Sequence, residues 1–438
     1  MGRPTWTGRA PRPTVVRNGN HRVDGDRARA GDARVPPLGA AMWCAGLATF
    51  VLVYSPQVLL PTFAAEFAVS SSTASLALSA TTLALAVAVV PLSAVCESWG
   101  RTRMMTAALA VSAALGLIEP FAPSFGVLVV LRALQGVALA ALPALAMAHT
   151  TREVAARWLG GAVGLLIAGN ALGGLTGRLV TGFVADVAGW RVALGVVGGV
   201  SLLCMVAFRL LLPAPRTPDP PRVRLRELGR PIGGHLADPV LRGLFAVSFL
   251  VMGAFVTVYN YSGFRLEAAP FGVPVGLAGL VFLGYLAGPV VSPWAGRVAD
   301  RHGRAPVVAA GLAVAAAGAW VTLPANLVVI CIGVLLVTVG FFTAHAVASG
   351  WAGRRAADLP DGSPALASSL YLLAYYAGSS VGGSLGGVAY DHLGWLGVSC
   401  FLTLLLAAGF LVALRLRTSS RGRAPVRGRP RVRRGRRP

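Results

Sequence analysis

The sequence of 438 residues contains no lysine, and only 13% of its residues carry a charge. Hydrophobic residues make up 55% of the chain, whereas ordinary soluble domains reach roughly 45–50% even when glycine is counted. This composition excludes an ordinary soluble globular protein and predicts an all-α integral membrane protein. All 39 basic residues are arginine, a bias from which we infer no function.

Residue patterns typical of metal sites and enzymes are also missing. The five cysteines lie singly, without metal-ligand or redox spacing, and we interpret them as small apolar residues. Neither a catalytic Ser/His/Asp set nor a phosphate-binding loop is visible. We therefore expect no enzymatic activity, no metal and no cofactor.

Residues 1–38 are rich in arginine, proline and glycine, and they lack the apolar run of a cleavable signal peptide. After them come about twelve apolar segments, each near the roughly 20 residues that a helix needs to cross a bilayer. We predict spans near 39–61, 73–96, 104–121, 124–149, 158–182, 190–212, 241–264, 274–297, 306–323, 325–350, 364–388 and 394–414. The predicted parts are a disordered tail (1–38), a first half (39–212), a linker (213–239), a second half (240–414) and an Arg-rich tail (415–438).

The net charge of +23 is distributed unevenly over this topology. We count 35 arginines in segments on one side, two on the other side (Arg191, Arg265) and two inside the membrane (Arg132, Arg178). Because cytoplasmic loops carry the excess of basic residues, both termini and the linker are predicted to be cytoplasmic. The basic inner face is expected to contact anionic lipids, and the linker could alternatively form a basic amphipathic helix there. The tails lack the interleaved aromatics and folded module of a nucleic-acid-binding protein.

A charged turn occurs twice between apolar segments. The second copy contains Gly296, Asp300, Arg301, Gly303 and Arg304. The weaker first copy has Ser93 for the leading glycine, Glu97 for the aspartate and Ser98 for the first arginine, followed by Gly100 and Arg101. A carboxylate, a glycine and an arginine at this spacing favour a tight turn at a membrane face.

Two glycine stripes also repeat. Each is followed by an aspartate and then by a Gly-Trp pair, with Asp186 in the first copy and Asp391 in the second. This repetition, together with the charged turn, predicts two related halves. Glycines at every fourth position allow close helix packing in lipid, and the stripes consist of Gly169, Gly173, Gly177, Gly378, Gly382 and Gly386.

Two arginines fall within predicted spans. Placing a guanidinium in a membrane helix costs roughly 2.5–3.5 kcal/mol, so Arg132 should face a polar partner inside the bundle unless it extends to the outer surface. Arg178 could bind an anionic substrate group or pair with Asp186. Seven tyrosines (Tyr54, Tyr259, Tyr261, Tyr285, Tyr371, Tyr375, Tyr376) are candidates for a central cavity or for an interfacial belt, with Gln57 and Asn260 nearby.

Three of these patterns resemble signatures of the major facilitator superfamily. The second charged turn matches the loop signature of that family, and Arg132, Gln135 and Gly136 match its Arg-any-any-Gln-Gly pattern. The segment around Asn170 is similar to the fifth-helix glycine signature of the drug/proton antiporters, except that the usual Gly-Pro is replaced by Gly169-Asn170 and Gly173-Gly174.

The resemblance implies two pseudo-symmetric six-helix bundles around a central cavity and transport by alternating access. It is strongest to the multidrug and sugar-efflux branch, which implies export of a small molecule driven by a proton gradient, with a monomer sufficient. The charged turns would form a cytoplasmic gate, consisting of Glu97, Gly100, Arg101, Gly296, Asp300, Arg301, Gly303 and Arg304.

The proton site is not identified, because no Asp or Glu occurs between Gly39 and Pro61, where several drug/proton antiporters carry one. We predict that Arg132 couples transport to protons, with Glu119 as a candidate acid. Two other functions stay open, a proton-symporting importer of a metabolite and a membrane sensor that binds its ligand without moving it.

Overall fold

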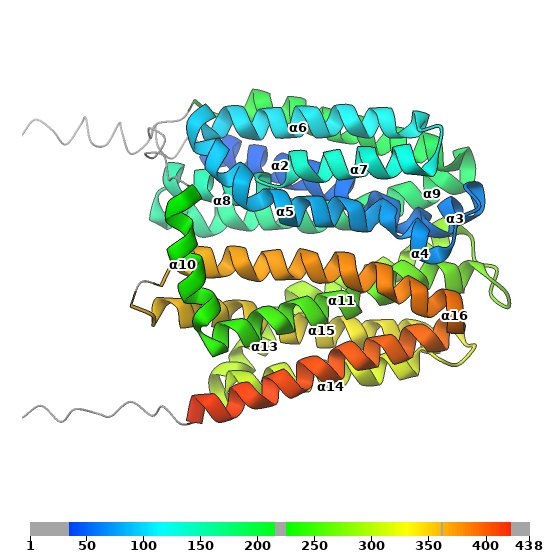
Figure 1. Cartoon of the computed structure of the whole chain (residues 1–438). Helices are drawn as coiled ribbons and strands as arrows, with labels where there is room; N and C mark the ends of the chain where they lie inside the picture. Colours follow the sequence, from blue (N-terminus) through cyan, green and yellow to red (C-terminus); the bar gives the residue numbers. More distant parts are fainter. Residues whose placement is uncertain (1–34, 215–224, 361, 422–438) are drawn as a thin grey trace, which may run out of the picture.

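A computed structural model describes residues 35–214, 225–360 and 362–421, and these residues form helices joined by short turns (Figure 1). In the first half, the elements are α2 (Val35–Tyr54), η1 (Ser55–Leu59), α3 (Leu60–Glu66), α4 (Ser71–Ala74), α5 (Leu76–Trp99), α6 (Arg101–Ile118), η2 (Glu119–Phe121), α7 (Phe125–Leu139), α8 (Leu142–Glu153) and α9 (Ala156–Leu211). The linker contains α10 (Leu225–Ala237). In the second half they are α11 (Pro239–Glu267), α12 (Val275–Ala278), η3 (Gly279–Ala287), α13 (Gly288–His302), α14 (Arg304–Val321), α15 (Leu327–Ala357) and α16 (Pro364–Arg421).

Nine helical stretches among the described residues are long and apolar enough to cross a membrane. Two of them, α9 and α16, each contain two spans, because the backbone leaves the helical conformation at Gly189 (φ +82°) and Gly394 (φ +59°). Glycine adopts these positive φ angles without the steric cost that a side chain would add. With α5, whose 24 residues also suffice to cross a bilayer, the described chain has the twelve predicted spans.

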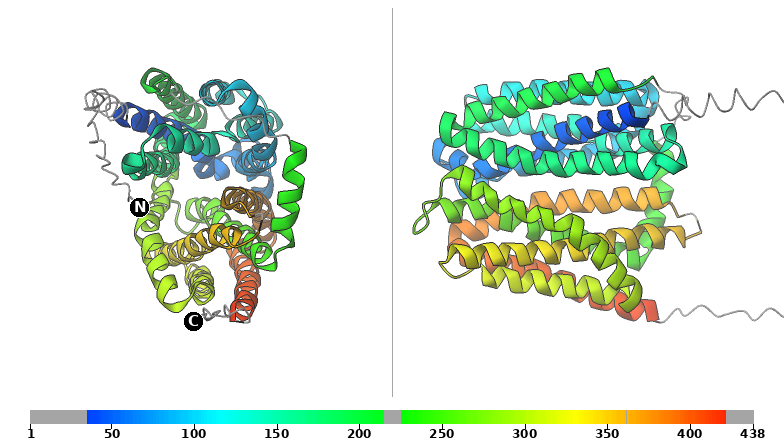
Figure 2. Two further views of the ribbon diagram at one scale, coloured as in Figure 1. Left: turned by 90° about the vertical axis from the view of Figure 1, so that its left-hand side faces the viewer. Right: turned by 180° about the vertical axis from the view of Figure 1, so that it is seen from behind.

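The helices form two bundles that lie side by side, one from each half of the chain (Figures 1 and 2). Helix α10 runs across one end of the molecule from the first bundle to the second, and we call this the linker end. The opposite end carries α3 and α4, and we call it the α4 end. The sequence-based topology assigns the linker end to the cytoplasm.

Both glycine stripes lie where two long helices touch. A Cβ atom on Gly173 would lie 2.5 Å from the carbonyl oxygen of Leu47, and one on Gly177 would lie 2.8 Å from that of Val51. Gly169 meets the α2 backbone in the same way, so this stripe packs α9 directly on α2. In the second half, Gly378, Gly382 and Gly386 pack α16 on α11, against Phe249, Gly253 and Thr257.

Several predicted spans differ from the structure in length or continuity, and the first and the eighth are examples. The first span runs over Val35–Glu66, beyond the predicted 39–61, and is broken by the η1 turn at Pro56. The eighth span, predicted as one helix over 274–297, passes from α12 through the 3₁₀ segment η3 into α13. Proline lacks the backbone N–H that a continuous helix needs, which explains the first break.

Candidate functional site

The side chain of Arg132 is completely buried and joins four spans of the first half. Its Nε donates to the carbonyl oxygen of Ala77 (3.0 Å), and its Nη atoms donate to those of Leu52 (2.9 Å) and Val53 (2.8 Å). The predicted polar partner inside the bundle is therefore present. The alternative, in which Arg132 extends to the outer surface, is wrong.

Pro56 explains why α2 offers carbonyl groups to Arg132. In a continuous helix, the carbonyl of Leu52 would accept a hydrogen bond from the backbone N–H of residue 56. Proline has no N–H, and the chain turns into η1 at this point. Arg132 and the hydroxyl of Ser55, 3.3 Å away, supply the missing donors to Leu52.

Arg132 also contacts Glu119, the residue that the sequence suggests as its acidic partner. The Nη1–Oε1 distance is 3.4 Å, and the Glu119 side chain is only 2% exposed. Gln135 accepts a hydrogen bond from Arg132 and donates one to the carbonyl of Ser112 (3.1 Å), while Gly136 lets α7 approach the backbone at Thr81. The Arg132–Gln135–Gly136 pattern thus builds a buried polar cluster around one ion pair.

Arg178 forms a second buried cluster, between the two halves. Its Nε donates to Oε1 of Gln57 (2.7 Å), Nη1 to the carbonyl of Gly174 (2.7 Å) and Nη2 to the hydroxyl of Tyr285 (3.3 Å). Of the two alternatives for Arg178, the pair with Asp186 is wrong, because that carboxylate instead accepts a hydrogen bond from the backbone N–H of Gly276 (2.8 Å). Arg178 therefore contacts only neutral groups among the described residues.

Three aromatic rings surround the Arg178 guanidinium. Its Cζ lies 4.3 Å from the ring centre of Tyr54, 4.7 Å from that of Phe282 and 4.6 Å from that of Tyr285. Cations within about 6 Å of a ring face are attracted by its quadrupole. Tyr54 comes from α2 and the other two rings from η3, so both halves contribute to this cage.

A chain of hydrogen bonds extends from Arg178 into the second half. Gln57 accepts from Arg178 and donates through Nε2 to Oδ1 of Asn260 (2.7 Å). The Nδ2 atom of Asn260 is buried and has no hydrogen-bond partner. Polar atoms buried inside a protein are almost always hydrogen-bonded, so an unpaired amide here is unusual.

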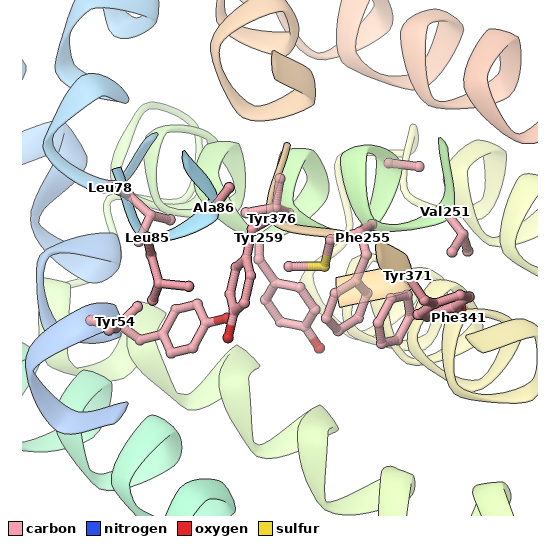
Figure 3. Packing of buried hydrophobic residues seen from close by; sticks show 14 of the residues in the cluster. Tyr54, Leu78, Leu85, Ala86, Val251, Phe255, Tyr259, Phe341, Tyr371 and Tyr376 are labelled. Carbon is pink, nitrogen blue, oxygen red and sulfur yellow. The ribbon is translucent and has the colours of Figure 1, made fainter. Parts of the chain in front are cut away.

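The predicted tyrosines lie inside the molecule. Figure 3 shows a row of rings that begins at Tyr54 of the first half and continues through residues of the second half, Tyr376, Tyr259, Phe255, Tyr371 and Phe341. Tyr285 packs against Tyr259 and Phe255, and His345 stacks on Phe341 (centroids 5.3 Å apart) and hydrogen-bonds Tyr371 (3.2 Å). Five of the seven tyrosines are buried, so the interfacial-belt interpretation is wrong for those five.

Part of this aromatic row keeps an accessible surface. Tyr285, His345 and Tyr375 are partly exposed, although each packs among rings from other helices. Four phenylalanines that no sequence motif indicates complete the row: Phe255, Phe282, Phe341 and Phe342. Their clustering in three spans of the second half was a visible signal, but apolar aromatics do not stand out in a membrane sequence.

Two aspartates join the halves at the α4 end. Asp391, after the second glycine stripe, accepts hydrogen bonds from the backbone N–H groups of Ser71 and Ser72 at the start of α4 (both 3.1 Å). Asp186, after the first stripe, accepts from Gly276 at the start of α12. Each carboxylate thus binds the beginning of a helix in the other half, where backbone N–H groups and the helix dipole favour an anion.

The charged turns lie at the linker end and have the predicted tight geometry. Gly100 (φ +86°) separates α5 from α6, and Gly303 (φ +90°) separates α13 from α14. Asp300 is exposed and makes no ion pair within the described residues; with Arg304, Trp351 and Arg417 it lines a surface cavity of about 420 Å³. Gly296 and Arg301 lie on α13, and Arg101 is buried at the start of α6. The side chain of Glu97 lies outside the described part.

Asn170 belongs to neither arginine cluster. Its side chain packs at Gly46 of α2, beside the glycine stripe, where a Cβ atom on Gly46 would lie 2.5 Å from Oδ1 of Asn170. The structure therefore separates the five residues that the sequence grouped as a coupling or cavity site. Arg132, Gln135 and Gly136 form one cluster, Arg178 forms another, and Asn170 lies at a helix contact.

Comparisons with known proteins agree with this architecture. The family model of the Major Facilitator Superfamily matches residues 41–358 and 267–438. The chain is 40% identical to the uncharacterized MFS-type transporter YybF of Bacillus subtilis (strain 168), over 86% of this chain and 91% of that protein. It is 38% identical to the inner membrane transport protein YnfM of Escherichia coli (strain K12), over 86% and 89%.

Solved transporter structures share the fold at low sequence identity. A structure of the nucleoside transporter NupG superposes with a TM-score of 0.69 at 11% identity, covering 87% of this chain and 99% of that one. A bacterial homologue of the human lysosomal transporter Spinster, in an inward-facing and occupied conformation, gives 0.66 at 15% identity, covering 87% and 96%. The chain is an all-α, multi-pass membrane transporter that belongs to the major facilitator superfamily.

Proposed function

We propose that the protein is a proton-coupled secondary transporter that exports a small molecule across the cell membrane by alternating access. The observation that carries the proton coupling is the buried pair of Arg132 and Glu119. A fixed cation favours the ionised carboxylate, whereas burial favours the neutral acid, so small rearrangements around the pair change its proton affinity. Such a group can bind a proton in one conformation and release it in another.

The contacts between the halves support alternating access. Asp391 and Asp186 hold the two halves together at the α4 end, while Asp300 at the linker end makes no ion pair within the described residues. If the linker end is cytoplasmic, this arrangement corresponds to a carrier closed toward the outside. Reversing the two sets of contacts would expose the central aromatic row to the other side.

A flux measurement tests the coupling. A thermal-stability screen of small organic molecules on the purified protein first identifies a compound that binds. Its uptake into inverted vesicles is then measured with and without a proton gradient, and we expect the gradient to accelerate uptake. Gradient-driven movement in the opposite direction would instead identify an importer, and binding without any flux would identify a sensor.

Variants of the buried pair connect the flux to these residues. Glu119→Gln keeps a hydrogen-bond acceptor for Arg132 but cannot ionise, so we expect transport that no longer responds to the gradient. Arg132→Lys keeps the charge without the planar fork and should retain part of the driven flux, whereas Arg132→Ala should lose it while binding survives.

The exposed pair of Glu66 and Arg191, joined at 2.8 Å in the same half, supplies the matched control. Glu66→Gln removes a carboxylate from an arginine without changing the buried cluster, and we expect its flux to follow the gradient as in the parent protein. A gradient response that persists in Glu119→Gln would assign the buried pair to packing.

A further inference from the structure

We propose that the cage around Arg178 is the binding site for an aromatic organic anion, a planar ring that carries a carboxylate. This inference rests on the proposed transport function and names the chemical class of the substrate. The cage consists of the Arg178 guanidinium, the rings of Tyr54, Phe282 and Tyr285, and the amides of Gln57 and Asn260.

The charge of the cage requires an anion. Arg178 is 1% exposed, and its hydrogen-bond partners are an amide, a backbone carbonyl and a hydroxyl, all neutral. Buried charges in proteins are paired as a rule, because transferring a lone ion out of water is costly. Arg132, which is also completely buried, follows that rule through Glu119. Arg178 has no carboxylate partner among the described residues, so the cage carries a positive charge that an anionic ligand would neutralise.

The unused hydrogen-bond donors of the cage also favour an anionic ligand. The guanidinium carries more N–H donors than its three partners use, and two parallel donors match the geometry of a carboxylate. Nδ2 of Asn260 is also buried without a partner, beside Gly383 of α16, while its Oδ1 faces Gln57. The free polar capacity of these two residues therefore consists of donors, which suit an acceptor-rich ligand.

The rings define the remainder of the ligand. The aromatic row continues from Tyr285 through Phe255 to Phe341 and His345, with a tilted contact at the first step and stacked contacts at the next two. Tyr285 and His345 are partly exposed within this row, so a planar group has aromatic surfaces on which to stack. Aromatic pairs contribute free energy beyond simple apolar burial.

Three small probes test the proposal on the purified full-length protein. Benzoate has the ring and the charge, benzamide has the ring without the charge, and acetate has the charge without the ring. Binding is measured calorimetrically in detergent, where no proton gradient exists. We expect benzoate to bind at least about tenfold more tightly than either of the others, a factor that corresponds to about 1.4 kcal/mol.

Two variants assign the selectivity to Arg178. Arg178→Gln should weaken benzoate binding at least about tenfold and abolish the preference over benzamide, whereas Arg191→Gln, which changes an exposed arginine, should leave both unchanged. If Arg178→Gln does not fold, the comparison of the three probes on the unaltered protein still tests whether the site selects an aromatic anion. Equal binding of benzoate and benzamide, or no benzoate binding at millimolar concentration, overturns the proposal.

The outcomes separate this inference from the proposed transport. Benzoate binding without proton-dependent flux would support the anion site and contradict the proposal of proton-coupled transport. Proton-driven flux of a compound that carries no anionic group, unaffected by Arg178→Gln, would support transport and overturn the anion site. Benzoate binding that survives in Arg178→Gln would show that Arg178 only joins the two halves.

Discussion

Asp186 and Asp391 occupy equivalent positions in the two halves, and each carboxylate binds the beginning of a helix in the opposite half. Asp391 accepts from Ser71 and Ser72 of α4, and Asp186 accepts from Gly276 of α12. The pair follows the internal duplication, since each aspartate comes after a glycine stripe and before a Gly-Trp pair. These two contacts close the α4 end symmetrically.

We expect the loss of the Asp391 contact to open the α4 end. Asp391→Ala removes both hydrogen bonds to α4, and losing such a helix cap costs about 0.5–2 kcal/mol. A cysteine at position 74, where Ala74 is fully buried, reports the change through its reaction with an impermeant thiol reagent in a cysteine-free background. The labelling rate should rise severalfold. An unchanged rate would show that the contact does not control opening.

We expect the loss of the Asp300 carboxylate, at the linker end, to favour the state that is closed at the α4 end. As an ionised group beside arginines, it is proposed to stabilise the state closed at that end, through hydrogen bonds of about 1.5–3 kcal/mol each. Asp300→Asn should leave insertion intact, lower transport strongly and slow the labelling of the cysteine at position 74. Glu97→Gln should act in the same direction but less.

Asp358→Asn, which changes another exposed carboxylate at the linker end, serves as the control for Asp300. It should transport almost normally. Near-normal transport in Asp300→Asn protein would contradict the gate role of the charged turn.

The glycine stripe gives a stability prediction with an internal control. Gly173→Ala places a methyl group 2.5 Å from the carbonyl oxygen of Leu47, so α9 and α2 must separate. Overpacking of this kind costs typically about 1–3 kcal/mol. Gly164→Ala, on the same helix with no atom within 4 Å of the added Cβ, should be neutral or slightly stabilising. Thermal unfolding of both variants in detergent checks the difference, and equal melting temperatures would contradict it.

Asp238 gives a pH-dependent prediction at the junction of α10 and α11. Partial burial favours its protonated form, but the hydrogen bonds from Arg355 (2.6 Å) and from the N–H groups of Leu241 and Val240 hold its pKa below the usual value. Because the folded pKa lies below the unfolded value, about 3.9, the contribution to stability is complete above that pH. It is lost as the pH falls through the folded pKa.

Asp238→Asn isolates this effect, since asparagine still caps α11 but forms no ion pair with Arg355. We expect the variant to melt below the parent protein at pH 6, with the difference shrinking as the pH falls below about 4. Thermal unfolding over this range measures it. A difference that stays constant with pH would show that the charge of Asp238 does not contribute.

The predicted topology is tested by reporter fusions. The 35 arginines assigned to one side place both termini and the linker in the cytoplasm. Fusions after residue 220 and after residue 430 should be active with a cytoplasmic reporter and inactive with a periplasmic one, and fusions at residue 270 should do the reverse. Periplasmic activity at the linker would overturn this orientation.

The sequence by itself determined the number of spans, the duplication and the close packing at the glycine stripes. A bilayer fixes how many apolar residues a span needs, so apolar runs and arginine counts can be read without a structure. Glycine at every fourth position likewise predicts close packing locally, and both stripes have it. The positive-φ turns at Gly100 and Gly303 follow from the same local chemistry.

Only the tertiary structure decided which polar groups meet. The sequence did not decide whether Arg178 binds a substrate anion or pairs with Asp186, because Asp186 follows it within the same stretch of chain. The fold instead directs Asp186 to Gly276 and surrounds Arg178 with Gln57 and three rings, most of them distant in sequence. Likewise, the carbonyl of Leu52, which lacks a backbone donor because of Pro56, accepts a hydrogen bond from Arg132 of another span. Such partners depend on how helices pack within each half and across the two halves, which no local pattern specifies.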